Sequence, residues 1–258
     1  MATPSRKTQR QNQILEKLVL NPSLRVHQLA EALEVSTETV RRDLAELDEG
    51  GKINRTYGGA VRTQRFEPAL SERLQLKVNE RQAIARRALE MLGNYETLLI
   101  GGGATTLHFA RAIRQLQHPM TVITPAYGVA QELSHNPFFE VFCLPGTFEG
   151  REGLVCGPQT IKAIERFQVP VAVLGASGVN REGISEALLS AGQVYEAMTA
   201  IADQVFVLAD SSKFNKRALT LFSPWSEKHT LLTNEQPAGE LLSAMTDGGA
   251  HAEVVDAG

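Results

Sequence analysis

The chain has 258 residues, of which 43% are hydrophobic, 21% charged and 6% aromatic. This composition is close to that of ordinary globular proteins and excludes disorder, collagen and coiled coil as descriptions of the whole chain. No run of 18 apolar residues is present and the first residues are polar and basic, so we expect neither a membrane span nor a secretory signal. With only two cysteines, Cys143 and Cys156, the chain can build no disulfide framework, and we expect a cytoplasmic protein.

Charge is unevenly distributed along the chain. The net charge is −3, but residues 1–66 carry 11 basic and 8 acidic side chains, whereas the remaining residues carry 15 basic and 21 acidic ones. A basic segment attached to an acidic body indicates that the first part meets a polyanion and that the second part does not.

Short helices are predicted over residues 7–20 and 26–33, and a third from Ser36 or Thr37 to Gly50, because apolar residues recur there at helical spacing. The residues expected to face inward are Ile14, Leu15, Leu18, Val26, Leu29, Ala30, Leu33, Val40, Leu44 and Leu47. The short turn Glu34-Val35-Ser36 joins the second helix to the third, which predicts a helix-turn-helix arrangement.

The third helix carries its cations early and most of its acids late. With Val40 facing the core, its first turns present Thr39, Arg41 and Arg42 outward. The helix dipole favours the opposite order, with acids at the start. Recognition helices enter the major groove of DNA by their N-terminal end, so this order favours DNA binding.

A β-hairpin is predicted after this helix, around Gly58-Gly59, with the glycines at its tip. Lys52, Arg55 and Arg62 flank the hairpin, so that it can lie along DNA phosphates. A solvated basic face would explain any one of these cations, but helix-turn-helix, ordered charge and hairpin occur together within one short segment.

Beyond a polar linker at residues 62–71, strands and helices alternate. Strands are expected at 97–100, 120–124, 139–144, 171–174, 205–209, 230–233 and 252–255, and helices at 78–92, 106–116, 126–133, 159–167, 187–201 and 240–245. An extended edge segment is also expected at 219–225. Short apolar strands that alternate with amphipathic helices predict a mainly parallel sheet covered on both faces.

Successive strand ends carry glycine, hydroxyl or other small residues. The segments are Gly101 to Thr106, Thr124 to Tyr127, Pro145 to Thr147, Gly175 to Gly178 and Asp210 to Lys213. Such loops expose backbone N–H groups at helix N-termini, and Lys213 adds a point charge. The first loop lacks the Gly-Lys-Ser/Thr of a nucleotide-binding P-loop, so a small anion such as a phosphate group is the expected ligand.

The string Val35-Ser36-Thr37-Glu38-Thr39-Val40-Arg41-Arg42-Asp43-Leu44, followed by Gly51 and by Arg55 to Ala60, resembles the winged helix-turn-helix signature of DeoR-family bacterial transcription regulators. The likeness continues to about residue 235. It implies a repressor, in many cases of carbohydrate metabolism genes, with an N-terminal winged helix-turn-helix and a C-terminal sensor of a phosphorylated sugar or related anion. The sensor fold is shared with ribose-5-phosphate isomerase and coenzyme A transferases. We therefore expect a DNA-binding domain at 1–62, a linker at 63–76 and a sensor domain at 77–258.

The partners expected are a double-stranded DNA operator and a small-molecule effector. The residues expected to bind DNA are Ser36, Thr37, Thr39, Arg41, Arg42, Lys52, Arg55, Thr56, Gly58 and Gly59. The residues expected to bind the effector, partly through the resemblance, are Gly102, Gly103, Ala104, Thr105, Thr106, Thr124, Gly146, Ser177, Gly178, Tyr195 and Lys213. Helix-turn-helix proteins bind DNA as symmetric oligomers, so a homodimer or homotetramer is expected.

The sensor departs from the family pattern at Gly101, where the family usually has Asp, and at Tyr195, where it commonly has Lys. These changes should alter which ligand hydroxyls are recognised. The alternative is a sugar-phosphate isomerase with a DNA-binding appendage, which would need Glu152, Glu186 or Asp210 as a base. The six histidines show no metal-ligand spacing, so we expect no metal. A regulator of the kind that the resemblance implies also needs no other cofactor and no catalytic residue.

Overall fold

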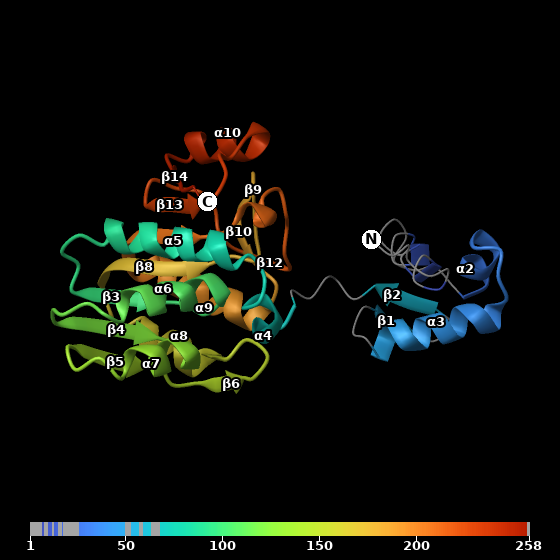
Figure 1. Ribbon diagram of the computed structural model, residues 1–258, viewed down its shortest axis with the longest axis horizontal. Coiled ribbons are helices and arrows are strands. Elements are labelled where there is room, and N and C mark those ends of the chain that lie inside the picture. The colour runs from blue at the N-terminus through green and yellow to red at the C-terminus, as the bar shows by residue number, and fades with distance from the viewer. Residues whose placement is uncertain are drawn as a thin grey trace. The chain divides into compact units, whose positions relative to one another are not determined.

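The chain folds as two compact units, Met1–Phe66 and Glu67–Gly258 (Figure 1). The computed structural model describes residues 26–49, 53–56, 59–62 and 68–256, and before them residues 7, 10, 11, 13, 14 and 17. The boundary between the units falls inside the linker that the sequence predicts at 63–76.

The first unit contains helices α2 (Val26–Ala32) and α3 (Thr37–Glu49) and the hairpin β1 (Ile53–Thr56) and β2 (Gly59–Arg62). The described positions between residues 7 and 17 are also helical. Its core consists of residues expected from the helical spacing, namely Ile14, Leu29, Ala30, Val40, Leu44 and Leu47. The predicted helix-turn-helix is therefore confirmed, whereas Leu15 and Leu18 lie outside the described residues.

The turn between α2 and α3 closes in a Schellman motif. Val35 N donates to Ala30 O at 3.1 Å and Glu34 N donates to Glu31 O at 3.2 Å. This pattern places Glu34 in the left-handed region, with φ of 52°. Glycine is the usual residue there, because any other side chain is strained by its Cβ.

The second unit is built on a seven-stranded sheet in the order β14-β13-β11-β8-β3-β4-β5. All neighbouring strands are parallel, which confirms the predicted sheet. The strands are β3 (Thr97–Ile100), β4 (Met120–Thr124), β5 (Phe139–Cys143), β8 (Val169–Gly175), β11 (Ala202–Leu208), β13 (His229–Thr233) and β14 (His251–Val254). The chain runs from β3 outward through β4 to β5, and β8 then pairs with the other side of β3. This reversal is a topological switch point, where open α/β sheets bind ligands.

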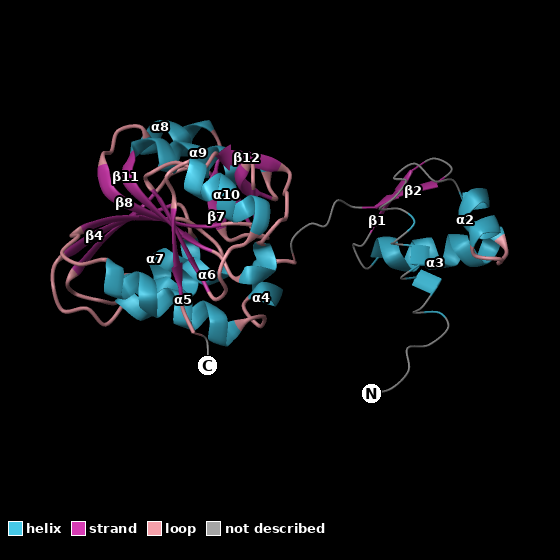
Figure 2. Cartoon of the chain, turned by 90° about the horizontal axis from the view of Figure 1, so that it is seen from above, coloured by secondary structure: helices cyan, strands magenta, loops and turns pink. Residues whose placement is uncertain are grey.

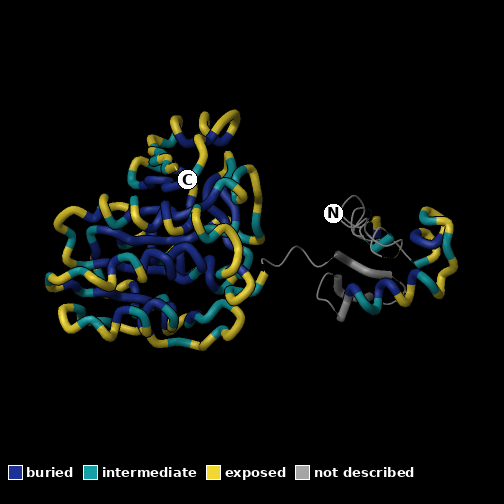
Figure 3. Tube along the Cα trace, in the orientation of Figure 1, coloured by how far each residue is buried: buried dark blue, intermediate teal, exposed yellow. Residues whose placement is uncertain are grey.

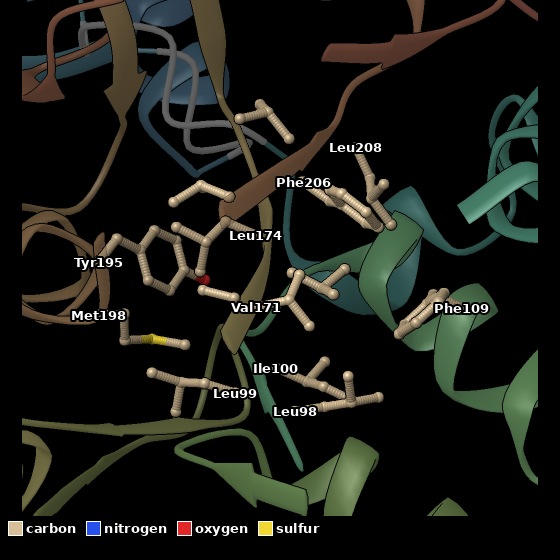
Figure 4. Close-up of a cluster of buried hydrophobic side chains, with 14 of the residues drawn as sticks. Leu98, Leu99, Ile100, Phe109, Val171, Leu174, Tyr195, Met198, Phe206 and Leu208 are labelled. Atoms are coloured by element: carbon tan, nitrogen blue, oxygen red, sulfur yellow. The ribbon is translucent and has the colours of Figure 1, made fainter. Parts of the chain in front are cut away.

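Helices cover both faces of this sheet (Figure 2). The helices on one face are α5 (Val78–Met91), α6 (Ala104–Ile113) and α7 (Tyr127–Leu133), and those on the other are α8 (Pro158–Ile164) and α9 (Leu189–Ile201). Helix α10 (Gly239–Asp247) follows β13. The inner strands of the sheet are mostly buried between the layers, whereas the edge strands β5 and β14 are half-buried or exposed (Figure 3). Phe109, Leu98, Ile100, Val171 and Phe206 belong to this core (Figure 4).

Short accessory strands are the part of the second unit that sequence patterns missed. A hairpin pairs β6 (Thr147–Glu149) with β7 (Leu154–Cys156), and a small sheet has the order β12-β10-β9. Of its strands β9 (Gly178–Asn180), β10 (Gly183–Glu186) and β12 (Thr220–Ser223), only the last lies in a segment predicted to be extended. Strands of three or four residues show too few alternations to reveal a period.

The predicted linker also contains a helix. Helix α4 (Leu70–Arg73) lies within residues 63–76 and belongs to the second unit. Its contacts are with residues distant in the chain: Leu70 N donates to Arg151 O at 3.3 Å, and Arg73 forms an ion pair with Glu152. The linker prediction is therefore wrong for residues 70–73, because one helical turn shows no periodicity in the sequence.

Candidate functional site

The start of α3 is capped by Ser36. Thr39 N donates to Ser36 Oγ at 3.1 Å, and the two hydroxyl oxygens lie 2.9 Å apart. Ser36 rather than Thr37 is therefore the N-cap, and Thr37 is the first helical residue. Ser36, Thr37, Arg41 and Arg42 are exposed and Thr39 is half-buried, so this end of the helix is accessible to a partner.

Two acidic residues of α3 are bound by residues of the first helical segment. Asp43 is buried, and its carboxylate accepts from Arg10 Nε at 2.5 Å and from Arg10 Nη2 at 3.2 Å. Glu46 accepts from Lys7 Nζ at 2.7 Å and from Gln11 Nε2 at 2.9 Å. The hydrogen bond from Lys7 lowers the pKa of Glu46. These two acids lie later in the helix than Arg41 and Arg42, as the sequence indicates, and they hold α3 to the first helical segment.

The two strands of the hairpin meet one residue earlier in the chain than predicted. Thr56 pairs with Gly59, so that only residues 57 and 58 lie between the strands. Gly59 is thus the first residue of β2 and not part of the tip, while Arg55 and Thr56 end β1. Lys52 and Gly58 lie outside the described residues.

A polar cavity in the second unit opens at the switch point between β3 and β8. Its volume is about 30 Å³, comparable to the space of one water molecule. The lining residues are Arg73, Arg81, Gly102, Gly103, Ala104, Thr105, Glu152, Leu154, Gly175, Ala176, Glu186, Ala191, Tyr195 and Lys213. We call these residues the sensor pocket. It includes Gly102, Gly103, Ala104, Thr105, Tyr195 and Lys213 from the predicted effector site.

The N-terminus of α6 forms one wall of the sensor pocket. Gly103 is its N-cap with φ of 123°, and the first helical hydrogen bond runs from Leu107 N to Gly103 O at 3.1 Å. The N–H groups of Ala104, Thr105 and Thr106 precede this bond and have no acceptor one turn earlier in the helix. N–H groups of this kind can donate to an anion, and the helix dipole favours negative charge at this end of a helix.

The sensor pocket contains two buried arginines, Arg73 and Arg81, and two acidic residues, Glu152 and Glu186. Arg73 forms an ion pair with Glu152. Arg81 donates to Arg73 O, and its Nη2 lies 3.5 Å from Asp210 Oδ2. Glu186 Oε1 accepts from Ser177 Oγ and from Ala187 N, each at 2.8 Å. With Lys213, the arginines can neutralise a bound anion, and the carboxylates can accept hydrogen bonds from hydroxyl groups.

The sequence analysis did not identify Arg73 or Arg81 as residues of this pocket, although the sequence contains a signal for Arg81. Arg81 lies with Ile84, Ala85 and Ala88 on the buried stripe of α5. A charged residue at an apolar position of an amphipathic helix requires a buried partner, and this signal could have identified it. Arg73 left no such signal, because its partner Glu152 lies in the turn between β6 and β7.

Several predicted effector residues have structural roles outside the lining of the sensor pocket. Thr124 Oγ1 donates to Ile100 O at 2.7 Å, and Thr106 Oγ1 donates to Gly103 O at 3.0 Å. Ser177 bonds to Glu186 and so lies behind it. At Gly146 and Gly178 a Cβ atom would come within 2.1 Å of Thr160 Oγ1 and 2.5 Å of Lys216 O. These glycines allow close packing and do not themselves line the cavity, although Gly175 and Ala176 of the segment that contains Gly178 do.

Tyr195 and Gly101 fit together at the floor of the sensor pocket. Tyr195 Oη donates to Gly102 O at 2.9 Å, and its ring packs edge-on against Phe222 at 5.6 Å between centroids. A Cβ atom at Gly101 would lie 3.1 Å from Tyr195 Cε1. Burial raises the pKa of Tyr195, so the phenol stays protonated. The ring of Tyr195 and Cδ2 of Leu174, 3.0 Å from the same Cβ position, therefore leave little space for a side chain at residue 101.

Comparisons with known proteins follow the same division into two units. Residues 10–66 match the family model described as the DeoR-like helix-turn-helix domain, and residues 76–235 match the DeoR C terminal sensor domain. The HTH-type transcriptional repressor CsqR of Escherichia coli strain K12 is 30% identical over 240 residues, covering 92% of each chain. The glycerol-3-phosphate regulon repressor of the same organism is 28% identical over 94% of this chain and 96% of the relative.

Solved structures of similar fold include ribose 5 phosphate isomerase A from Neisseria gonorrhoeae, with a TM-score of 0.40, 17% identity and 53% of each chain covered. The curated relatives are named as repressors, which confirms a regulator rather than an enzyme. Within the part of the chain that the structure describes, no helix is long and apolar enough to cross a membrane. The same residues contain no group of histidine, cysteine or acidic side chains that could hold a metal ion.

Proposed function

Since the chain belongs to the DeoR family of transcriptional regulators, we propose that it represses genes of carbohydrate metabolism and that a phosphorylated sugar or related small anion controls it. The observation that carries this proposal is the sensor pocket, in which the start of α6, Arg73, Arg81 and Lys213 surround one cavity together with Glu152 and Glu186. Such a pocket offers N–H groups and cations to a phosphate and carboxylates to hydroxyl groups.

On the DNA side, Arg41 and Arg42 at the exposed start of α3 contact base edges or phosphates, with Thr39 beside them. The hairpin residues Arg55 and Thr56 lie along the backbone of the operator. Two copies of the chain bind the two halves of a symmetric operator, so the active form is a homodimer or homotetramer. The effector changes operator affinity only to the extent that it binds two arrangements of the protein differently.

Operator binding is tested by fluorescence anisotropy with duplex DNA from upstream of the regulator's own gene, against scrambled duplexes of equal length. We expect a preference of about 10³-fold or more at physiological salt. Equal affinity for both duplexes would refute sequence-specific regulation.

The ligand class is tested by thermal shift of the purified protein with glycerol 3-phosphate, glucose 6-phosphate and fructose 6-phosphate, each beside its unphosphorylated parent. A ligand at 100 times its Kd stabilises a protein by roughly 2.7 kcal/mol, which is a readily measured shift. Stabilisation by the phosphorylated members alone is the expected result. Equal stabilisation by the parents, or no stabilisation by any compound, contradicts the phosphate site.

A further inference from the structure

The helix that joins the linker to the second unit is held in place by residues of the sensor pocket. Helix α4 begins four positions after the unit boundary at Phe66. Arg73, at its end, pairs with Glu152, and Arg81 of α5 donates to the carbonyl of Arg73. Arg73, Arg81 and Glu152 all line the cavity. The attachment of α4 thus depends on the groups that would meet a ligand.

The cavity of about 30 Å³ holds little more than a water molecule, so a phosphate monoester that enters it has to compete for the groups that line it. The ends of β3 and β8 belong to the interior of the seven-stranded sheet. Tyr195 is fixed by its hydrogen bond to Gly102 and by Phe222. By contrast, α4 is a single helical turn in which Ser71 and Glu72 are exposed. Compared with those strands and with Tyr195, α4 is a short element whose attachment includes the Arg73–Glu152 ion pair at the cavity.

We propose that the ligand's phosphate takes Arg73 from Glu152, and that this exchange of partners displaces α4. The inference rests on the proposed function and adds the residue through which the sensor pocket acts on the linker. Glu152, whose side chain is 14% exposed, loses one cation in the exchange, and the loss of an ion-pair partner in a largely buried place is costly. A hydroxyl group of the ligand supplies the replacement hydrogen bond. A phosphate that carries hydroxyl groups therefore displaces α4 more effectively than inorganic phosphate.

A displacement of α4 also moves the end of the linker, because the linker from the DNA-binding unit leads directly into α4. Moving α4 changes where and at what angle the linker leaves the second unit. The ligand then favours one arrangement of the linker by the difference between its contacts with displaced and docked α4.

The first test measures hydrogen exchange of the full-length protein with and without glycerol 3-phosphate and inorganic phosphate, each added in excess of its calorimetric Kd. In the wild type, we expect glycerol 3-phosphate to raise exchange several-fold in peptides from residues 70–76 and 149–153, which lose their mutual contacts. Exchange at the start of α6 should fall. In Glu152→Gln, exchange in residues 70–76 should already be raised without ligand. The matched control is Glu132→Gln, which removes a surface carboxylate bound by Arg111 and Arg114, and it should behave as the wild type.

The second test asks whether Arg73 touches the phosphate or only neutralises Glu152. Calorimetry compares inorganic phosphate binding by Glu152→Gln with binding by the double variant Arg73→Gln, Glu152→Gln. A direct contact predicts a loss of roughly tenfold or more in the double variant. A neutralising role predicts affinities within about twofold. Melting curves of both variants verify that each is folded.

The outcomes separate the two proposals. Wild-type protein that binds neither inorganic phosphate nor any of the three phosphorylated compounds of the thermal-shift experiment overturns the anion pocket and, with it, the exchange. Binding that leaves exchange in residues 70–76 unchanged, or equal affinities in the second test, overturns the exchange alone.

Discussion

The start of α3 and the sensor pocket both present arginines, but they hold them in opposite states. Arg41 and Arg42 are exposed, and the neighbouring acids Asp43 and Glu46 are bound by other residues. Arg73 and Arg81 are buried, and each lies beside a carboxylate. Arg41 has only an exposed ion pair with Glu38, at 3.7 Å. Exposed charges are screened by salt and held weakly, so these cations can meet DNA at little structural cost and their binding depends on salt. The buried cations can meet a ligand only by changing partners, so their binding is coupled to structure.

The largest expected effect comes from removing one member of a buried pair. Arg81→Met should destabilise the second unit by roughly 3–5 kcal/mol, because Asp210 remains buried without its cation. Urea unfolding followed by the fluorescence of Trp225 measures the loss. The control Arg114→Met breaks a pair with Glu132 on the surface and should cost about 1 kcal/mol or less. Equal losses in the two variants would mean that burial makes no difference to these pairs.

The second unit should also be the acid-sensitive one. His229 is fully buried between Ser223 and Ser226, and burial lowers its pKa to about 4. The unfolded chain takes up a proton near the ordinary histidine value of about 6.5, before the native state does. Stability should therefore fall by roughly 3 kcal/mol as the pH drops from 6.5 to 4.

The check is urea unfolding across this pH range for the wild type and for His229→Gln, whose amide can replace the imidazole hydrogen bonds. The variant should lose much less stability over the same range. His135→Gln, which removes an exposed imidazole, is the matched control. A wild-type profile in His229→Gln would show that another group causes the acid loss.

Operator binding should show the smaller, salt-dependent energies of exposed charges. Arg42→Ala is expected to weaken operator affinity by about 1–3 kcal/mol if Arg42 reads a base, or to reduce the salt slope by about 1 if it contacts a phosphate. Anisotropy titrations at several salt concentrations distinguish the two. Arg114→Ala, an exposed arginine of the second unit, serves as control. Unchanged affinity and unchanged slope for Arg42→Ala would argue against α3 as the reading helix.

The smallest effect concerns the turn that orients α3. Glu34→Gly should stabilise the first unit by about 1 kcal/mol, because glycine adopts the left-handed conformation of this position without strain. Hydrogen exchange in peptides from residues 26–49 should slow by about fivefold. Glu31→Gly, within α2, should have the opposite sign. Faster exchange in Glu34→Gly would show that the side chain of Glu34 contributes more than its backbone strain costs.

The predictability of the two regions differs for a physical reason. The core of the first unit follows from local periodicity, since Leu29, Val40, Leu44 and Leu47 recur at helical spacing. The parallel sheet can also be predicted from the alternation of strands and helices. The loop from Gly102 to Thr105 can be predicted as part of the site, because the strand ends of a parallel sheet meet at one edge.

The rest of the sensor pocket depends on contacts between distant segments. Arg73 meets Glu152 through a turn of short strands, and Asp43 is buried because Arg10 reaches it from another helix. Thr124 and Ser177 were predicted as ligand residues from their place after strands, yet their hydroxyls bond within the protein. Composition and spacing cannot distinguish a hydroxyl that faces a cavity from one that holds a loop.

The fit of Tyr195 against Gly101 limits how the ligand preference of this regulator could be redesigned. An aspartate at position 101 would meet the aromatic ring at a distance that even its first side-chain carbon barely tolerates. A smaller residue at 195 alone would leave a hole beside Phe222 and remove the hydrogen bond to Gly102. Neither substitution is an acceptable intermediate by itself, so a new specificity at this floor requires both positions to change in one step.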